Sequence, residues 1–152
     1  DFCGQLPLHC AAQHQAGLDV VTALIQAHPE AASTADEEEG KLPLHYAAEK
    51  QAWSKVVKEL LEACPDAAST ADKHGKLPLH LAAQKQAGLE VVLALLEVYP
   101  AAATIFDDFG SDQGNVPLHY AAACEAGLEV VAALLQAEPA AANYPDKYGK
   151  LP

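Results

Sequence analysis

A seven-residue phrase that recurs along the chain constrains its fold more than any other feature. The phrase reads Leu/Val-Pro-Leu-His-x-Ala-Ala, and its four copies begin at Leu6, Leu42, Leu77 and Val116. A fifth copy would begin at Leu151, one residue before the end of the sequence. Successive starts lie 36, 35, 39 and 35 residues apart. Self-similarity at such a period is typical of repeat proteins, in which each unit packs only on its neighbours.

The sequence pattern of each repeat predicts one turn followed by two helices. Asp72 and Gly75 stand at the first and fourth positions of a segment just before the phrase, which is the pattern of a type I turn. The proline of the phrase suits the first position of a helix, so we expect a helix over about residues 7–15. An apolar face at helical spacing predicts a second helix from about residue 18. Pro29 should end it, because the residue before a proline avoids the α conformation.

The phrase, the turn and the segment Gly88-Leu89-Glu90-Val91-Val92 together resemble the ankyrin repeat, whose signature is T-P-L-H-x-A. The resemblance covers essentially the whole chain. It implies an all-α solenoid of stacked helix-turn-helix units with short β-hairpin or turn connections. Framed from the aspartate of each turn, the expected units of this single array are 1–35, 36–71, 72–106 and 107–145, with a partial fifth at 146–152.

The chain departs from the family pattern at the residue before the proline. The family has threonine there, which can cap the helix, and this chain has leucine or valine. The missing cap costs roughly 1 kcal/mol per helix. It also removes the hydroxyl with which the family's histidine usually pairs. We infer that the apolar side chain is instead buried between repeats.

The recurring histidines could be mistaken for a metal site. Stacked helices lie roughly 8–10 Å apart, whereas zinc needs its nitrogen ligands at about 2 Å. We therefore expect structural residues that hydrogen bond within and between repeats, namely His9, His45, His80 and His119. The recurring Gly-Lys pairs lack the remaining residues of a phosphate-binding loop, and no nucleophile recurs beside a histidine and an acid. We expect no cofactor, no metal and no enzymatic activity.

The net charge of −12 restricts the classes of partner. No lysine or arginine occurs between Gln86 and Asp146. Binding to nucleic acid or to an anionic membrane surface depends on such residues, so we reject nucleic acid as a partner of this segment, and the same charge disfavours an anionic membrane. A basic protein partner is favoured, although the charge could serve solubility alone.

The sequence favours a location inside the cell. No apolar run is long enough to span a membrane, and the four cysteines form no C-x-x-C pair. We expect an intracellular protein, cytoplasmic by default. An organelle or the nucleus stays open, because the array looks interrupted at both ends and we expect the natural chain to continue.

The resemblance implies a binding surface made by the turn tips and the exposed side of the first helices. Matched position by position, the tips are Glu37, Glu38, Lys73, His74, Phe109, Ser111, Asp112, Gln113, Lys147 and Tyr148. The positions after the Ala-Ala pair are Gln13, His14, Glu49, Lys50, Gln84, Lys85, Ala123 and Cys124.

Two further features of the sequence bear on binding. Trp53 replaces a glycine between the helices of repeat two, and it either packs locally or anchors a partner. The turn over residues 107–115 is longer than the others and has aromatic neighbours, and insertions in repeat proteins often map to the binding face. The longer turn could make a specific contact with a partner, or it could be an insertion without effect on binding.

These observations favour a scaffold or adaptor that binds another protein. Two alternatives remain open. The array could be a bracing subunit of a larger multiprotein assembly, or the targeting module of a larger enzyme or channel.

Overall fold

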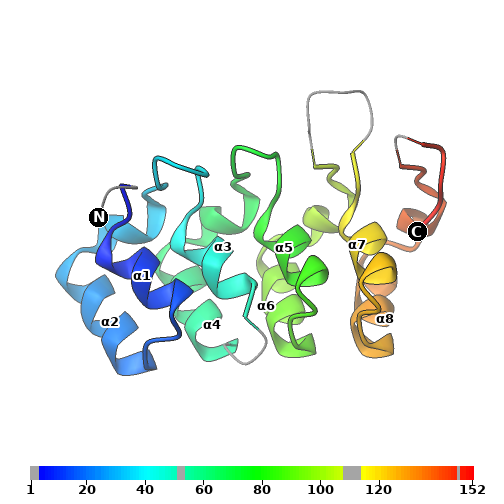
Figure 1. Ribbon diagram of the computed structural model, residues 1–152. Helices are drawn as coiled ribbons and strands as arrows, with labels where there is room; N and C mark the ends of the chain where they lie inside the picture. Colours follow the sequence, from blue (N-terminus) through cyan, green and yellow to red (C-terminus); the bar gives the residue numbers. More distant parts are fainter. Residues whose placement is uncertain (1–3, 51–53, 108–113, 147) are drawn as a thin grey trace.

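The computed structural model describes residues 4–50, 54–107, 114–146 and 148–152. In that part of the chain, α-helices and short 3-10 helices follow one another without a strand. The first helices of successive repeats pack side by side in one row, as seen in Figure 1. These helices are α1 (Pro7–Gln13), α3 (Pro43–Ala48), α5 (Pro78–Gln84) and α7 (Pro117–Ala123).

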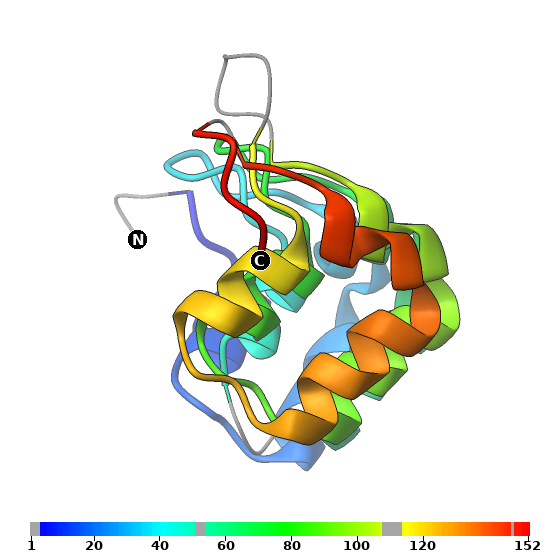
Figure 2. The ribbon, with the colours of Figure 1, turned by 90° about the vertical axis from the view of Figure 1, so that its right-hand side faces the viewer.

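The second helices make a parallel row behind the first. Figure 2 looks along the stack and shows the two layers, with the turns projecting at one end of the first layer. This arrangement confirms the expected all-α ankyrin-type solenoid. The second helices are α2 (Leu18–Ala27), α4 (Ser54–Ala63), α6 (Leu89–Val98) and α8 (Leu128–Ala137).

The first helix of repeat one ends two residues earlier than expected. We predicted an end near Gln15, but α1 ends at Gln13 and Gln15 has a left-handed backbone with φ of 58°. The N–H of Ala16 then bonds back to the carbonyl of Ala11 at 3.0 Å. This is the Schellman closure of a helix, which the spacing of apolar residues does not reveal.

A proline follows each second helix, as expected, but it also begins a 3-10 helix that the sequence analysis did not predict. The alanines of these segments, such as Ala31 and Ala32, are buried. Their small side chains let the segment pack closely on its own repeat and on the next one. The segments are η1 (Pro29–Ser33), η2 (Pro65–Ser69), η3 (Pro100–Thr104) and η4 (Pro139–Asn143).

The residues before the first prolines of α3, α5 and α7 are buried, as inferred, whereas Leu6 before α1 is only half-buried. Leu42 and Leu77 are 3% exposed, and Val116 is fully buried. Full burial of an aliphatic side chain contributes about 1.5–3 kcal/mol, which exceeds the roughly 1 kcal/mol that a threonine cap would supply. Burial therefore offsets the missing cap at these positions.

The connections between repeats are turns, and the part of the chain described contains no β-strand. Asp36 N donates to Lys41 O at 2.9 Å, and Asp72 N donates to Lys76 O at 3.0 Å. The predicted turn is found at Asp72, whose carbonyl accepts from Gly75 N at 3.0 Å, the bond that closes a four-residue β-turn. Gly75 has φ of 72°, which favours glycine.

Candidate partner-binding surface

One carboxylate oxygen of each turn aspartate organises the tip. Asp72 Oδ1 accepts hydrogen bonds from His74 N at 2.8 Å and Lys76 N at 2.9 Å. In the longer second turn, Asp36 Oδ1 accepts from Glu39 N at 2.7 Å. These bonds satisfy backbone donors that a tight turn would otherwise leave unpaired. The shape of the tips is therefore determined locally.

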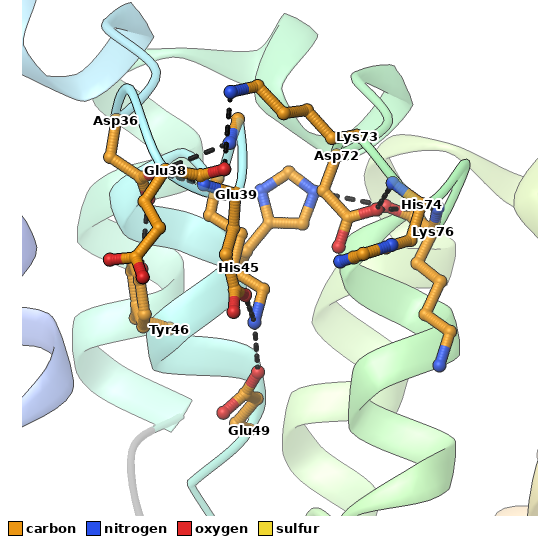
Figure 3. A network of polar contacts seen from close by, with 12 residues as sticks. Asp36, Glu38, Glu39, His45, Tyr46, Glu49, Asp72, Lys73, His74 and Lys76 are labelled. Carbon is orange, nitrogen blue, oxygen red and sulfur yellow. Dashed lines mark hydrogen bonds and ion pairs between the residues drawn. The ribbon is translucent and has the colours of Figure 1, made fainter. Parts of the chain in front are cut away.

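The other oxygen of Asp36 reaches the helix of its own repeat. Tyr46 donates its hydroxyl to Asp36 Oδ2 at 2.9 Å (Figure 3). Burial and this hydrogen bond raise the pKa of Tyr46 to about 12. Burial opposes ionisation of Asp36, but its hydrogen bonds outweigh that effect and lower its pKa. Tyr120 makes the same bond to Asp107 in repeat four.

Lys73 joins two successive tips. Its ammonium donates to the carbonyl oxygens of Glu37 and Glu38, the latter at 3.2 Å (Figure 3). Its backbone N–H donates to Glu39 O at 2.9 Å. The structure thus brings together three residues that the sequence analysis assigned to the binding surface. The acceptors are backbone carbonyls, so these two bonds do not involve the carboxylates of Glu37 and Glu38, and both residues are exposed.

A second lysine links the turn to the far end of the first helix. Lys41 Nζ lies 2.6 Å from Glu39 Oε2 and 3.0 Å from Glu49 Oε1, and only 11% of its side chain is exposed. Burial alone would lower the pKa of Lys41, but the two carboxylates raise it. In the next repeat, Lys76 donates to Gln84 Oε1 at 3.1 Å.

Sequence reasoning missed the role of these lysines. It compared the recurring Gly-Lys pair only with phosphate-binding loops. The spacing of eight residues from Lys41 to Glu49 and from Lys76 to Gln84 is the same in both repeats. That spacing was the signal that could have identified the pairs.

Each recurring histidine bonds within its repeat and to the next. His45 Nδ1 accepts from Leu42 N at 3.1 Å, so its Nε2 carries the proton and donates to Lys76 O at 3.2 Å. Burial lowers the pKa of His45, against the opposing effect of Asp72. Corresponding pairs of bonds are made by His9, His80 and His119, and the bond of His80 to the next repeat is to Asn115 O at 3.2 Å.

The remaining predicted residues of the first helices lie at the helix ends away from the turns. Gln13 and Gln84 are the last residues of α1 and α5 and are half-buried. His14 and Lys85 follow them and are exposed, and Lys50 is half-buried. The candidate surface therefore extends along the first-helix layer from the turn tips to these ends.

The long turn is described only at its base. Phe106 packs on Tyr144 of the following repeat, with ring centroids 5.7 Å apart. Tyr148 is 74% exposed, and His74 is also exposed. The predicted contact residues that lie outside the described part of the chain are Trp53, Phe109, Ser111, Asp112, Gln113 and Lys147.

Two findings concern the described residues as a whole. Within residues 4–50, 54–107, 114–146 and 148–152, no group of three or more His, Cys, Asp or Glu side chains is arranged to hold a metal ion. None of the helices in these ranges is long and apolar enough to cross a membrane.

Comparison with known proteins agrees with the geometry. A family model described as ankyrin repeats (3 copies) matches residues 8–107 and 54–147. No curated protein matches the chain. The matched ranges cover most of the stacked helix pairs, with the four histidines that link them. The chain therefore belongs to the ankyrin-repeat family.

Proposed function

We propose that this chain is a scaffold or adaptor that binds a partner protein through the turn tips and the first-helix layer. Ankyrin repeats are generally protein–protein interaction modules, and the family is typically non-enzymatic. The proposal concerns which residues of this array make the contact.

The observation that carries the proposal is the contrast between constant buried positions and variable positions nearer the surface. The phrase residues Leu44 and His45 are fully buried, and their counterparts recur in every repeat. By contrast, the second position after the Ala-Ala pair holds His14, Lys50 and Lys85 in successive repeats, at exposed or half-buried sites. Packing accounts for the constant residues but not for the variation, which a specific partner would require.

The charges of the tips favour a basic partner. The carboxylates of Glu37 and Glu38 lie at exposed positions, whereas Lys41 and Lys73 are engaged in contacts within the array. The whole chain carries a net charge of −12. Such a surface accelerates the approach of a positively charged protein, and salt weakens the effect.

The test is affinity capture from the source extract at low and high salt, with mass spectrometry of the captured proteins. We expect a stoichiometric basic partner at low salt that the variant Glu37→Gln/Glu38→Gln captures poorly. The matched control is Glu30→Gln/Asp66→Asn, which removes the same charge at exposed positions in η1 and η2. If both variants lost captured partner equally, the binding would depend on net charge and not on the tips. If the tip variant captured as much partner as the original chain, the proposed surface would be refuted.

A further inference from the structure

Helix α6 carries two exposed aliphatic residues that the fold does not require. Leu93 is 47% exposed and Val98 is 41% exposed. Both lie on the second-helix layer, away from the turn tips. The position of Leu93 holds Thr22, Lys58 and Ala132 in the other repeats, and that of Val98 holds Ala27, Ala63 and Ala137.

These two residues border two crevices that occupy equivalent places one repeat apart. The crevice between α4 and α6 measures about 290 Å³, and Leu61, Pro65 and Val98 are among its lining residues. The crevice between α6 and α8 measures about 380 Å³, and Leu93 and Pro100 are among its lining residues. Pro65 and Pro100 have the same place in their repeats. The outer face of α6 therefore forms an apolar ridge with a hollow on each side.

Glu97 lies between the hollows and gives the ridge its charge. It lines both crevices. The first crevice is lined by two acidic residues, Glu62 and Glu97, and by one basic residue, Lys58. In the second crevice, Glu97 is the charged residue of the lining. A partner should therefore present a basic side chain between two aliphatic ones. A second copy of this chain is disfavoured, because each copy carries a net charge of −12.

We propose that the outer face of α6 docks a short amphipathic helix of a partner protein. That helix carries aliphatic side chains at positions i and i+7 and Lys or Arg at i+3 or i+4. Seven helical residues span about 10.5 Å, which is close to the roughly 8–10 Å between stacked helices. The two aliphatic side chains thus enter consecutive crevices, and the basic residue between them faces Glu97. Anchors at this spacing are those of a helix bound in a groove.

The probe is a fluorescein-labelled, alanine-based helical peptide with leucines at i and i+7 and lysines at i+3 and i+4. Anisotropy reports its affinity, and amide chemical shifts of the labelled protein report its location. We expect shifts along α4, α6 and α8. Affinity should be about tenfold lower for Leu93→Ala/Val98→Ala and several-fold lower for Glu97→Gln. Repeat four carries alanine at both positions (Ala132 and Ala137), so we expect these changes to preserve folding.

Two matched controls make the test specific. Val20→Ala removes an equally exposed aliphatic residue, 48% exposed, from α2 and should leave the affinity unchanged. A peptide with leucines at i and i+4 should bind weakly, as should one with glutamates in place of lysines. The proposal fails if no shift appears near millimolar peptide. It also fails if shifts are confined to the first helices and turns, or if Val20→Ala weakens binding equally. Self-association that Leu93→Ala/Val98→Ala abolishes in sedimentation would assign the face to a second copy instead.

Discussion

Leu81 stands where two other repeats carry a tyrosine, and Asp72 is left with one buried carboxylate oxygen that lacks a hydrogen-bond partner among the described residues. In repeats two and four, Tyr46 and Tyr120 donate to the second oxygen of the turn aspartate. Both tyrosine rings pack edge-on against the histidine of the preceding repeat, with centroids 6.2 Å apart. A tyrosine at position 81 should therefore be able to donate to Asp72 Oδ2, a hydrogen bond that leucine cannot make.

Leu81→Tyr is expected to stabilise the protein by about 1 kcal/mol, because a buried unsatisfied acceptor costs about 1–3 kcal/mol. Urea unfolding at neutral pH measures the change. Leu81→Phe is the control, since it adds the ring without the hydroxyl. A tyrosine variant no more stable than the phenylalanine variant would show that the hydroxyl does not reach Asp72.

Acid is expected to destabilise the array from about pH 6.5 downward. Burial lowers the pKa of His9, His45 and His80 in the folded state below the ordinary value of 6.5. The unfolded chain then binds protons that the folded chain does not, so stability is complete above pH 6.5 and falls as the pH drops toward the folded-state pKa. Each such histidine contributes a slope of up to about 1.4 kcal/mol per pH unit.

Urea unfolding at several pH values between 7 and 5 measures this slope. His45→Asn removes one titrating group, so the slope for that variant should be smaller by about one proton's contribution. Its stability at pH 7 will also be lower, but the slope is a separate measurement. A stability independent of pH over this range would contradict neutral buried histidines.

The contact between Lys41 and Glu49 is expected to contribute about 1 kcal/mol to the free energy of unfolding. Only 11% and 18% of the two side chains is exposed, so solvent and salt screen the pair less than an ordinary surface ion pair. A double-mutant cycle with Lys41→Met and Glu49→Ala measures the coupling energy.

The equivalent pair in the next repeat serves as the control. Lys76 donates to the neutral amide oxygen of Gln84, so a cycle with Lys76→Met and Gln84→Ala should give a smaller coupling energy. Equal values for the two cycles would mean that the charge on Glu49 adds nothing to the hydrogen bond.

Gln15→Gly is expected to stabilise the protein by about 0.5–1 kcal/mol, because glycine adopts the left-handed conformation without the steric cost of a side chain. Gln13→Gly, at the last helical residue of α1, should destabilise it by a similar amount. Thermal or urea unfolding of the two variants gives the comparison. A loss of stability in both would show that the helix end does not depend on the backbone of Gln15.

Much of the local structure could be predicted because it depends on residues close together in the chain. Pro43 begins α3, and Asp72 with Gly75 closes a β-turn, through interactions that span only a few residues. The burial of Leu42 could also be inferred, since an apolar residue at a capping position must gain stability from packing. The left-handed closure at Gln15 was missed, because glutamine does not mark that conformation as glycine would.

The sequence by itself determined the repeat, the order of turn and helices, and the residues that face the interior, since these depend on spacing along the chain. Only the tertiary structure decided which side chains meet between repeats. It placed the ammonium of Lys73 on the carbonyl of Glu38, 35 residues away, and it set Leu93 and Val98 beside hollows formed by neighbouring helices. Such contacts depend on the distance and orientation of stacked units, which spacing within one repeat does not specify.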